Sequence, residues 1–379
     1  MTPLELFFDL VYVFAISRIA GNLIGHVDGR GIAETLVLTL AAMYAWFMTA
    51  WTSNWLDVDR RPVQLMLLGL MFASLLMSTS ITGAFANTPW SWIGDRAALF
   101  VVGYLAIQLG RTLFAVVAFR DHRLHGHFVN ALAWEAGTSA IWIAGIFASG
   151  DARLTIWGIA VAATYGGVIA GHPLPGRPRP FSTDSQVYAE HLLERFRLFF
   201  LIALGETVLS IGGAFSGVPV EFETLLALTV AFVGAASLWW CHFHRVERLG
   251  ADAALAAGDA SRIVAVGNYA LIAMVVGIIA IAAGDELALV DRTGSTSSTA
   301  TVLIFGGPAL FLLTQLVSIW HATGTVQRSR ILGCAALLLL AFASAPFNLV
   351  VAVTCASAVL LAVAISDTLA ERERTPAAS

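Results

Sequence analysis

Long apolar segments recur from one end of the chain to the other, and this feature restricts the possible folds most strongly. An α-helix needs about 20 consecutive apolar residues to cross the hydrocarbon core of a bilayer. Runs of this kind predict twelve membrane-spanning helices, at residues 4–25, 31–53, 63–86, 97–119, 127–149, 154–171, 192–215, 222–243, 263–284, 300–322, 331–346 and 349–368. The sequence therefore indicates an all-α, polytopic membrane protein.

The overall composition supports this class and excludes several others. Hydrophobic residues make up 58% of the 379 residues and charged residues only 12%, whereas soluble domains average about 25% charged residues. A disordered chain, a soluble enzyme and a nucleic-acid-binding protein are excluded, the last because it needs a basic surface. Cys241, Cys334 and Cys355 lie at no metal-ligand spacing, so we expect no disulfide framework, no metal site and no cofactor.

The arginines outside the predicted spans are distributed unevenly between alternate loops. Most of them, including Arg330, follow even-numbered spans or lie in the C-terminal tail, whereas loops after odd-numbered spans hold few, such as Arg153. Because positive residues are enriched on the cytoplasmic side, this alternation predicts that both termini are cytoplasmic. The first span carries Glu5, Asp9 and Arg18 and has no basic segment before it, which is not typical of a signal peptide.

The chain divides near its midpoint into two predicted halves of six helices. The segment 173–191 contains four prolines, which disfavour helix and predict an extended cytoplasmic linker. A shift of 189 residues aligns a few residues of the first span with the seventh, as expected for two repeats in the same orientation. The predicted parts are an N-terminal half at 1–172, the linker, a C-terminal half at 192–368 and a cytoplasmic tail at 369–379.

Ionisable residues inside the predicted spans are the candidate functional residues, because burying a charge in a bilayer is expensive. Glu5 and Asp9 are four residues apart, so they share one helical face about one turn from each other. Two carboxylates in this arrangement could bind a cation or share one proton. The alternative for Glu5 is an interfacial position, stabilised by the dipole at the start of the helix.

The seventh predicted span carries the densest polar pattern. His191, Glu194 and Arg195 have the i, i+3, i+4 spacing of one helical face. Glu206 follows Arg195 by eleven residues, which places it on the same face about 16 Å deeper. Glu206 is therefore either part of an ion or proton pathway, or a structural partner of Arg18 or Arg111.

A further mid-span carboxylate, Glu135, lies in the fifth predicted span. Arg18 in the first span and Arg111 in the fourth are the natural counter-charges, and the sequence leaves open which arginine pairs with which carboxylate. Motifs of common enzyme classes, such as Gly-x-Ser-x-Gly, His-Glu-x-x-His, the P-loop and the Rossmann glycines, are missing from the sequence, and their absence disfavours an enzyme.

Two long motifs carry a family resemblance. They are residues 4–16, LELFFDLVYVFAI, and residues 191–207, HLLERFRLFFLIALGET. Both resemble sequences of the bacterial low temperature requirement protein A (LtrA) family, and the likeness runs along nearly the whole chain. This resemblance implies a multi-pass protein of the bacterial inner membrane, linked to growth in the cold. It implies no particular biochemical activity, because the family has no settled one.

A more distant likeness concerns the first motif alone. The segment around Asp9 is similar to the Phe-Ser-Asp motif that opens the first span of the endolysosomal potassium and proton channel family. Members of that family are built from six-helix units, and the motif lines their pore. This chain has Phe8 where the motif has Ser, and Leu198 in its second half where the motif has Asp. The likeness therefore implies a related fold rather than potassium conduction.

Together these features predict a protein that moves a small cation or proton through a polar pathway lined by the first and seventh spans. Its expected partners are the lipid bilayer and that ion, with no nucleic acid, and a homo-oligomer is compatible with the sequence. One alternative is an intramembrane enzyme acting on a lipid or isoprenoid, with the same carboxylates as acid and base. Another is a stress-related scaffold without turnover. The predicted pathway residues are Glu5, Asp9, Glu135 and Glu206, the cytoplasmic polar cluster is His191, Glu194 and Arg195, and the counter-charges are Arg18 and Arg111.

Overall fold

The computed structural model describes residues 2–86, 95–176, 186–246, 260–291 and 294–372. Within these ranges every long element is a helix, and the only β-bridge is an isolated pair between Ser295 and Asn348. The described residues form twelve long helical segments, which confirms the predicted all-α, polytopic fold. Part of the predicted linker 173–191 and most of the tail 369–379 lie outside the described residues.

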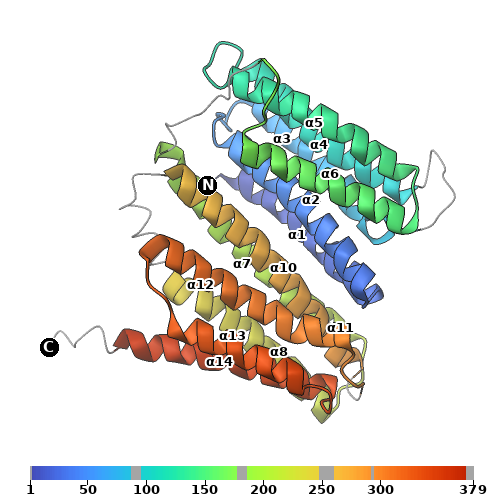
Figure 1. Cartoon of the computed structure of the whole chain (residues 1–379), viewed down its shortest axis with the longest axis vertical. Coiled ribbons are helices and arrows are strands. Elements are labelled where there is room, and N and C mark those ends of the chain that lie inside the picture. Colours follow the sequence, from blue (N-terminus) through green and yellow to red (C-terminus); the bar gives the residue numbers. More distant parts are fainter. Residues whose placement is uncertain (1, 87–94, 177–185, 247–259, 292–293, 373–379) are drawn as a thin grey trace. The chain divides into compact units, whose positions relative to one another are not determined.

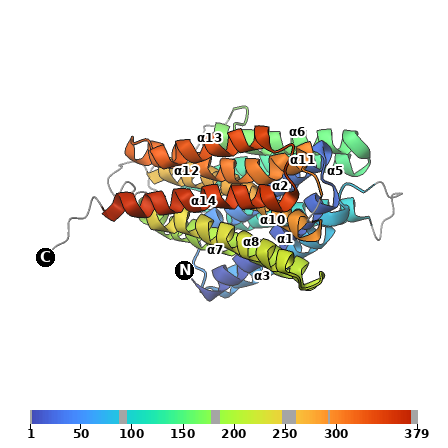
Figure 2. The ribbon, with the colours of Figure 1, turned by 90° about the horizontal axis from the view of Figure 1, so that it is seen from below.

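The chain separates into two compact units. One unit consists of Met1–Asn22 and Arg30–Arg195, and the other of Leu23–Gly29 and Phe196–Ser379. One boundary between them falls inside a helix, α7 (Gln186–Ser216), directly after Arg195. Within each unit the helices lie close to parallel with one another (Figure 1), and the view turned by 90° shows the same alignment (Figure 2).

The first unit is a bundle in which α2 occupies the interior. Side chains of α2 hydrogen-bond to α1 and α5, and a backbone carbonyl of α2 accepts from the hydroxyl of Tyr165 on α6. Most residues of the second half of α2 are buried. The bundle also pairs α3 with α4, α4 with α5 and α5 with α6. Its elements are α1 (Pro3–Gly25) up to Asn22, α2 (Gly29–Ser53) from Arg30, α3 (Arg61–Ser80), the 3₁₀ turn η1 (Ile81–Gly83), α4 (Arg96–Ala118), α5 (His125–Ile146), α6 (Gly150–Ala170) and the start of α7.

Two tryptophan–glycine contacts fix α5 against α6. The indole of Trp157 on α6 covers Gly145 of α5, where an added Cβ would lie 2.2 Å from the indole nitrogen. In the opposite direction, the indole of Trp134 on α5 covers Gly167 of α6 at 2.1 Å. Each indole N–H also donates to a backbone carbonyl of the other helix, at 3.0 and 3.1 Å. Both glycines are needed because no side chain fits beneath the rings.

The second unit is built around α10, which packs against α8, α12 and α14. Two short π-helical segments interrupt regular geometry here, and π segments often occur at functional sites. The elements are the rest of α7, α8 (Phe222–Cys241), the π segment η2 (His242–Val246), α10 (Ala260–Val290), α11 (Ser298–Thr301), the π segment η3 (Val302–Gly306), α12 (Gly307–Thr323), α13 (Arg328–Ala343) and α14 (Leu349–Arg372).

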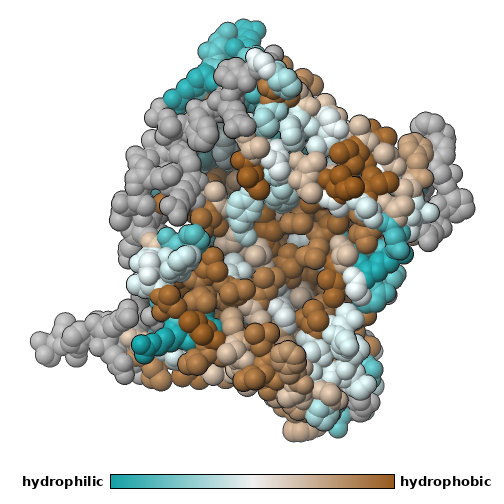
Figure 3. Space-filling model, in the orientation of Figure 1, coloured by the Kyte–Doolittle hydropathy of each residue, from teal (hydrophilic) through white to brown (hydrophobic). Residues whose placement is uncertain are grey.

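The outward faces of many helices are apolar. On α3, for example, Leu65, Leu68, Phe72 and Leu75 are exposed at helical spacing, and hydrophobic residues cover much of the face seen in Figure 3. Ten of the helical segments in the described ranges are long and apolar enough to cross a membrane. The two other long helices, α5 and α13, were predicted as spans but are not among these ten.

Candidate functional site

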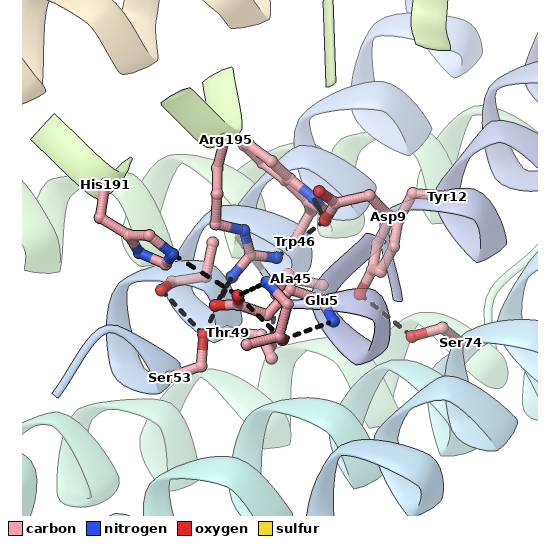
Figure 4. A network of polar contacts seen from close by, with 12 residues as sticks. Glu5, Asp9, Tyr12, Ala45, Trp46, Thr49, Ser53, Ser74, His191 and Arg195 are labelled. Atoms are coloured by element: carbon pink, nitrogen blue, oxygen red, sulfur yellow. Dashed lines mark hydrogen bonds and ion pairs between the residues drawn. The ribbon is translucent and has the colours of Figure 1, made fainter. Parts of the chain in front are cut away.

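A buried polar cluster in the first unit joins residues from three helices (Figure 4). Glu5 and Asp9 project from one face of α1, and His191 and Arg195 project from the start of α7 with the same four-residue spacing. The third helix is α2, which contributes Trp46 and other polar groups near its end. We call these residues, with Ser53 at the end of α2 and Asn54 directly after it, the carboxylate–arginine cluster.

Asp9 and Arg195 form the centre of this cluster. Oδ1 of Asp9 accepts hydrogen bonds from Nη2 of Arg195 at 2.8 Å and from Nε1 of Trp46 at 2.7 Å. Asp9 is 0% exposed and Arg195 is 1% exposed. The guanidinium also donates from Nη1 to Oγ of Ser53 at 2.9 Å and lies over the ring of Phe8. The arginine is therefore held by charge, hydrogen bonds and an aromatic ring at once.

Glu5 extends the cluster toward the surface. Its Oε1 lies 3.7 Å from Nη1 of Arg195, and its Oε2 accepts hydrogen bonds from the backbone and hydroxyl of Thr2 at 2.8 and 3.0 Å. Nε2 of His191 lies 3.5 Å from the same Oε2, and the histidine side chain is 32% exposed. His191 is thus the ionisable member of the cluster that water can reach.

The hydrogen bonding of His191 allows a proton to bind between its Nε2 atom and Oε2 of Glu5. Nδ1 of His191 lies 2.8 Å from Oδ1 of Asn54, and a hydrogen bond there requires the proton on Nδ1. In a neutral ring Nε2 is then an acceptor that faces a carboxylate oxygen, which is unfavourable. A proton bound to Nε2, or to the carboxylate, turns this contact into a hydrogen bond.

The charges in the cluster do not balance. Glu5 and Asp9 are both buried, at 2% and 0% exposed, and Arg195 is the single arginine that pairs with them among the residues that the structure describes. Within those residues, Oε1 of Glu5 and Oδ2 of Asp9 have no hydrogen-bond partner. Burying an uncompensated charge is costly in free energy. Binding of one more positive charge would therefore stabilise the cluster.

A second buried ion pair in the first unit is balanced. Arg111 of α4 pairs with Glu135 of α5, and its Nη2 also donates to Oε1 of Gln108 at 2.7 Å. Tyr44 of α2 approaches the same carboxylate. Both charged residues are at most 3% exposed. This pair carries one charge of each sign, so it needs no further ion.

The remaining predicted site residues lie elsewhere. Arg18 donates from Nη2 to Oγ1 of Thr82 at 2.8 Å, and Glu194 lies on an exposed side of α7. Glu206 belongs to the second unit, where it is 2% exposed and accepts a hydrogen bond from Ser210 at 2.9 Å. Among the described residues, no three His, Cys, Asp or Glu side chains are arranged to hold a metal ion.

Comparison with known proteins identifies the family. The model of the bacterial low temperature requirement A protein family, LtrA, matches residues 1–365. The chain belongs to the LtrA family. It is also 31% identical over 368 residues to an uncharacterized protein of Rhizobium meliloti (strain 1021). The aligned region covers 95% of this chain and 86% of the relative. No solved structure matches it.

The two LtrA-like motifs of the sequence contribute opposite sides of the cluster. Residues 4–16 lie in α1 and supply both carboxylates, and residues 191–207 lie in α7 and supply His191 and Arg195. Trp46 is not among the residues that the sequence patterns indicate, although a buried indole N–H generally needs an acceptor. The need of its indole N–H for an acceptor is the only sequence signal for Trp46, and it does not identify Asp9 as that acceptor.

One buried histidine near the linker gives this LtrA-family chain a predicted pH dependence. His172 follows α6 with a φ of 49°, and burial, with smaller contributions from His127 and Arg111, lowers its pKa from 6.5 to about 4. The unfolded chain therefore takes up a proton below about pH 6.5, whereas the folded chain takes it up only near pH 4. Stability is expected to fall by about 3 kcal/mol as the pH falls through this window.

Replacing His172 with asparagine, which tolerates positive φ, is expected to remove this pH-dependent loss. The measurement is the free energy of unfolding in detergent micelles at several pH values between 7 and about 4. His321→Asn, at an exposed position on α12, is the control and should retain the wild-type pH dependence. An identical pH dependence of His172→Asn and the wild type would contradict the assignment.

Proposed function

We propose that this LtrA-family protein moves a proton or a small cation across the membrane, and that the ion binds at the carboxylate–arginine cluster. The observation that carries the proposal is the surplus negative charge of the cluster, where two buried carboxylates share one guanidinium. A buried site that lacks one positive charge can bind a mobile cation or a proton. Binding such ions is a usual role of ionisable residues inside membrane helices.

The exposure of the cluster residues decreases from His191 to Asp9, and this order supports entry and release of the ion through His191. His191 is partly exposed and contacts Glu5, Glu5 contacts Arg195, and Arg195 contacts Asp9, which is fully buried. A proton taken up at His191 can pass to Glu5, and the guanidinium can then exchange between the two carboxylates. We also propose an ion or proton role for Glu206, a buried carboxylate further along α7.

The proposal includes a location. We place the protein in the bacterial inner membrane with both termini on the cytoplasmic side, so that His191 and Glu5 are reached from the cytoplasm. The distribution of arginines between alternate loops supports this orientation. The lipid bilayer and the transported ion are then the partners of the chain.

The test is ion flux into proteoliposomes, measured separately for H⁺, K⁺ and Na⁺. We expect flux above that of empty liposomes for the wild type, and a reduction of about tenfold or more in Asp9→Asn, because the variant removes the surplus charge. The amide oxygen of asparagine can still accept from Trp46 and Arg195, so the variant is expected to fold.

Glu190→Gln is the matched control, since Glu190 also lies on α7 next to His191 but is exposed. It should keep the wild-type flux, and Glu206→Gln should lose it. The proposal fails if the wild type carries none of the three ions, or if Asp9→Asn carries them as fast as the wild type.

A further inference from the structure

A small cavity lies in the second unit, separate from every residue discussed so far as a site. Its lining comes from α8, α10, α12, α14 and the π segment η3. The space in which the centre of a water-sized molecule can move is about 10 Å³, which is room for roughly one water molecule or one small ion. The residues that define it are Gly234, Asp285, Ile304, Pro308 and Ser357.

Asp285 is the one charged side chain that lines this cavity. It lies on α10 among apolar neighbours and is 6% exposed. Among the described residues, no hydrogen bond or ion pair involves its carboxyl group, and no other titratable side chain lines the cavity. Arg330, a buried arginine of this unit, already forms an ion pair with Asp367. A carboxylate buried in this way needs either a proton or a cation.

Two further oxygen groups belong to residues that line the same cavity. Ser357 of α14 contributes a hydroxyl group, and an added Cβ at Gly234 would lie 2.8 Å from its Oγ. Glycine at this position therefore keeps space open beside the hydroxyl. Pro308 has no N–H, so the carbonyl oxygen of Ile304, four residues earlier, lacks its usual α-helical donor. The π segment η3, which ends two residues before Pro308, also departs from α-helical hydrogen bonding in this turn.

The close packing of α10 brings these groups together. A Cβ at Gly284, the residue before Asp285, would lie 3.0 Å from Cγ1 and 3.5 Å from Cα of Ile304. A larger residue would push α10 away from the π segment. The glycine thus holds the carboxylate next to the turn in which helical hydrogen bonding is interrupted.

We propose that the cavity formed by Asp285, Ser357 and the Ile304–Pro308 turn binds a single small monovalent cation of the size of Na⁺. Carboxylate, hydroxyl and carbonyl oxygens are hard ligands, which suit a hard cation. A single carboxylate balances a monovalent charge, and the small volume disfavours a larger ion. This site does not rest on the proposed transport function, because binding can be measured without flux.

The test is binding of radioactive Na⁺ to the purified full-length protein in detergent, with choline chloride keeping the ionic strength constant. We expect saturable binding of about one Na⁺ per chain, and weaker binding by about tenfold or more in Asp285→Asn, which removes the only formal charge of the site. Ser357→Ala should bind more weakly than the wild type as well.

Glu286→Gln is the matched control, because Glu286 is the adjacent carboxylate on α10 and does not line the cavity. It should bind Na⁺ as the wild type does. If Asp285→Asn does not fold, Ser357→Ala decides the question by itself. The proposal is overturned by a wild type that binds no Na⁺, by unchanged binding in Asp285→Asn or in Ser357→Ala, or by K⁺ competing as well as Na⁺.

Discussion

Replacing Arg195 with glutamine is expected to lower the free energy of unfolding by about 3–5 kcal/mol. The substitution leaves Glu5 and Asp9 buried with no guanidinium beside them, and Asp9 then keeps only the indole of Trp46 as a donor. Removing one partner of a buried ion pair is costly because the other charge stays buried and uncompensated. The loss can be measured by unfolding of the purified protein in detergent micelles.

The double variant Asp9→Asn/Arg195→Gln separates this cause from a simple packing defect. It removes one charge of each sign, so it should be less destabilised than Arg195→Gln alone. Arg197→Gln is the control on the same helix, where an exposed guanidinium stacks over Phe243 and its loss should cost less than about 1 kcal/mol. A double variant that is less stable than Arg195→Gln would refute the charge argument.

A loss of the same size, about 3–5 kcal/mol, is expected for Arg330→Met in the second unit. Arg330 on α13 is fully buried and pairs with Asp367 on α14. Its guanidinium also donates to the backbone carbonyl of Cys241 at 3.1 Å and to Oε1 of Gln315 at 3.2 Å. One side chain therefore ties four helices together, and methionine replaces its volume without its charge.

The double variant Arg330→Met/Asp367→Leu should be more stable than Arg330→Met, because apolar residues of similar volume can substitute for a buried ion pair. Arg328→Met, two residues earlier and exposed, should remain within about 0.5 kcal/mol of the wild type. Thermal unfolding in detergent compares all four proteins. Equal losses in Arg328→Met and Arg330→Met would show that burial of the pair is not the cause.

The helices could be predicted because their signals are local. Apolar runs mark the spans, and the four-residue spacing places Glu5 beside Asp9 on one face of α1 without any tertiary information. Asp9 pairs with Arg195, 186 positions away, because the helices pack together. The spacing of residues along the chain cannot predict such a pair. The same holds for Arg111, which had several candidate partners and contacts Glu135.

Hydropathy assigns residues near the ends of spans to a helix or a loop least reliably. Arg330 was assigned to a loop, but α13 begins at Arg328 and the guanidinium is buried. Arg153 was likewise assigned to a loop and lies in the first turn of α6, where it donates to carbonyl oxygens of Ala84 and Ala148. Asp285 was placed just beyond a span ending at residue 284, whereas α10 continues to Val290. Hydropathy is averaged over a window of residues, so it does not locate the first and last turns of a helix.

The reciprocal tryptophan–glycine contacts between α5 and α6 have a mechanical consequence. Each indole sits in the notch left by a glycine of the other helix, and the two notches face opposite ways. A shift of either helix by a single residue, about 1.5 Å along its axis, would drive one ring into backbone atoms or a larger side chain. Sliding in either direction is blocked, so α5 and α6 travel as one rigid body, and any working motion of the first unit has to be accommodated by other helix pairs.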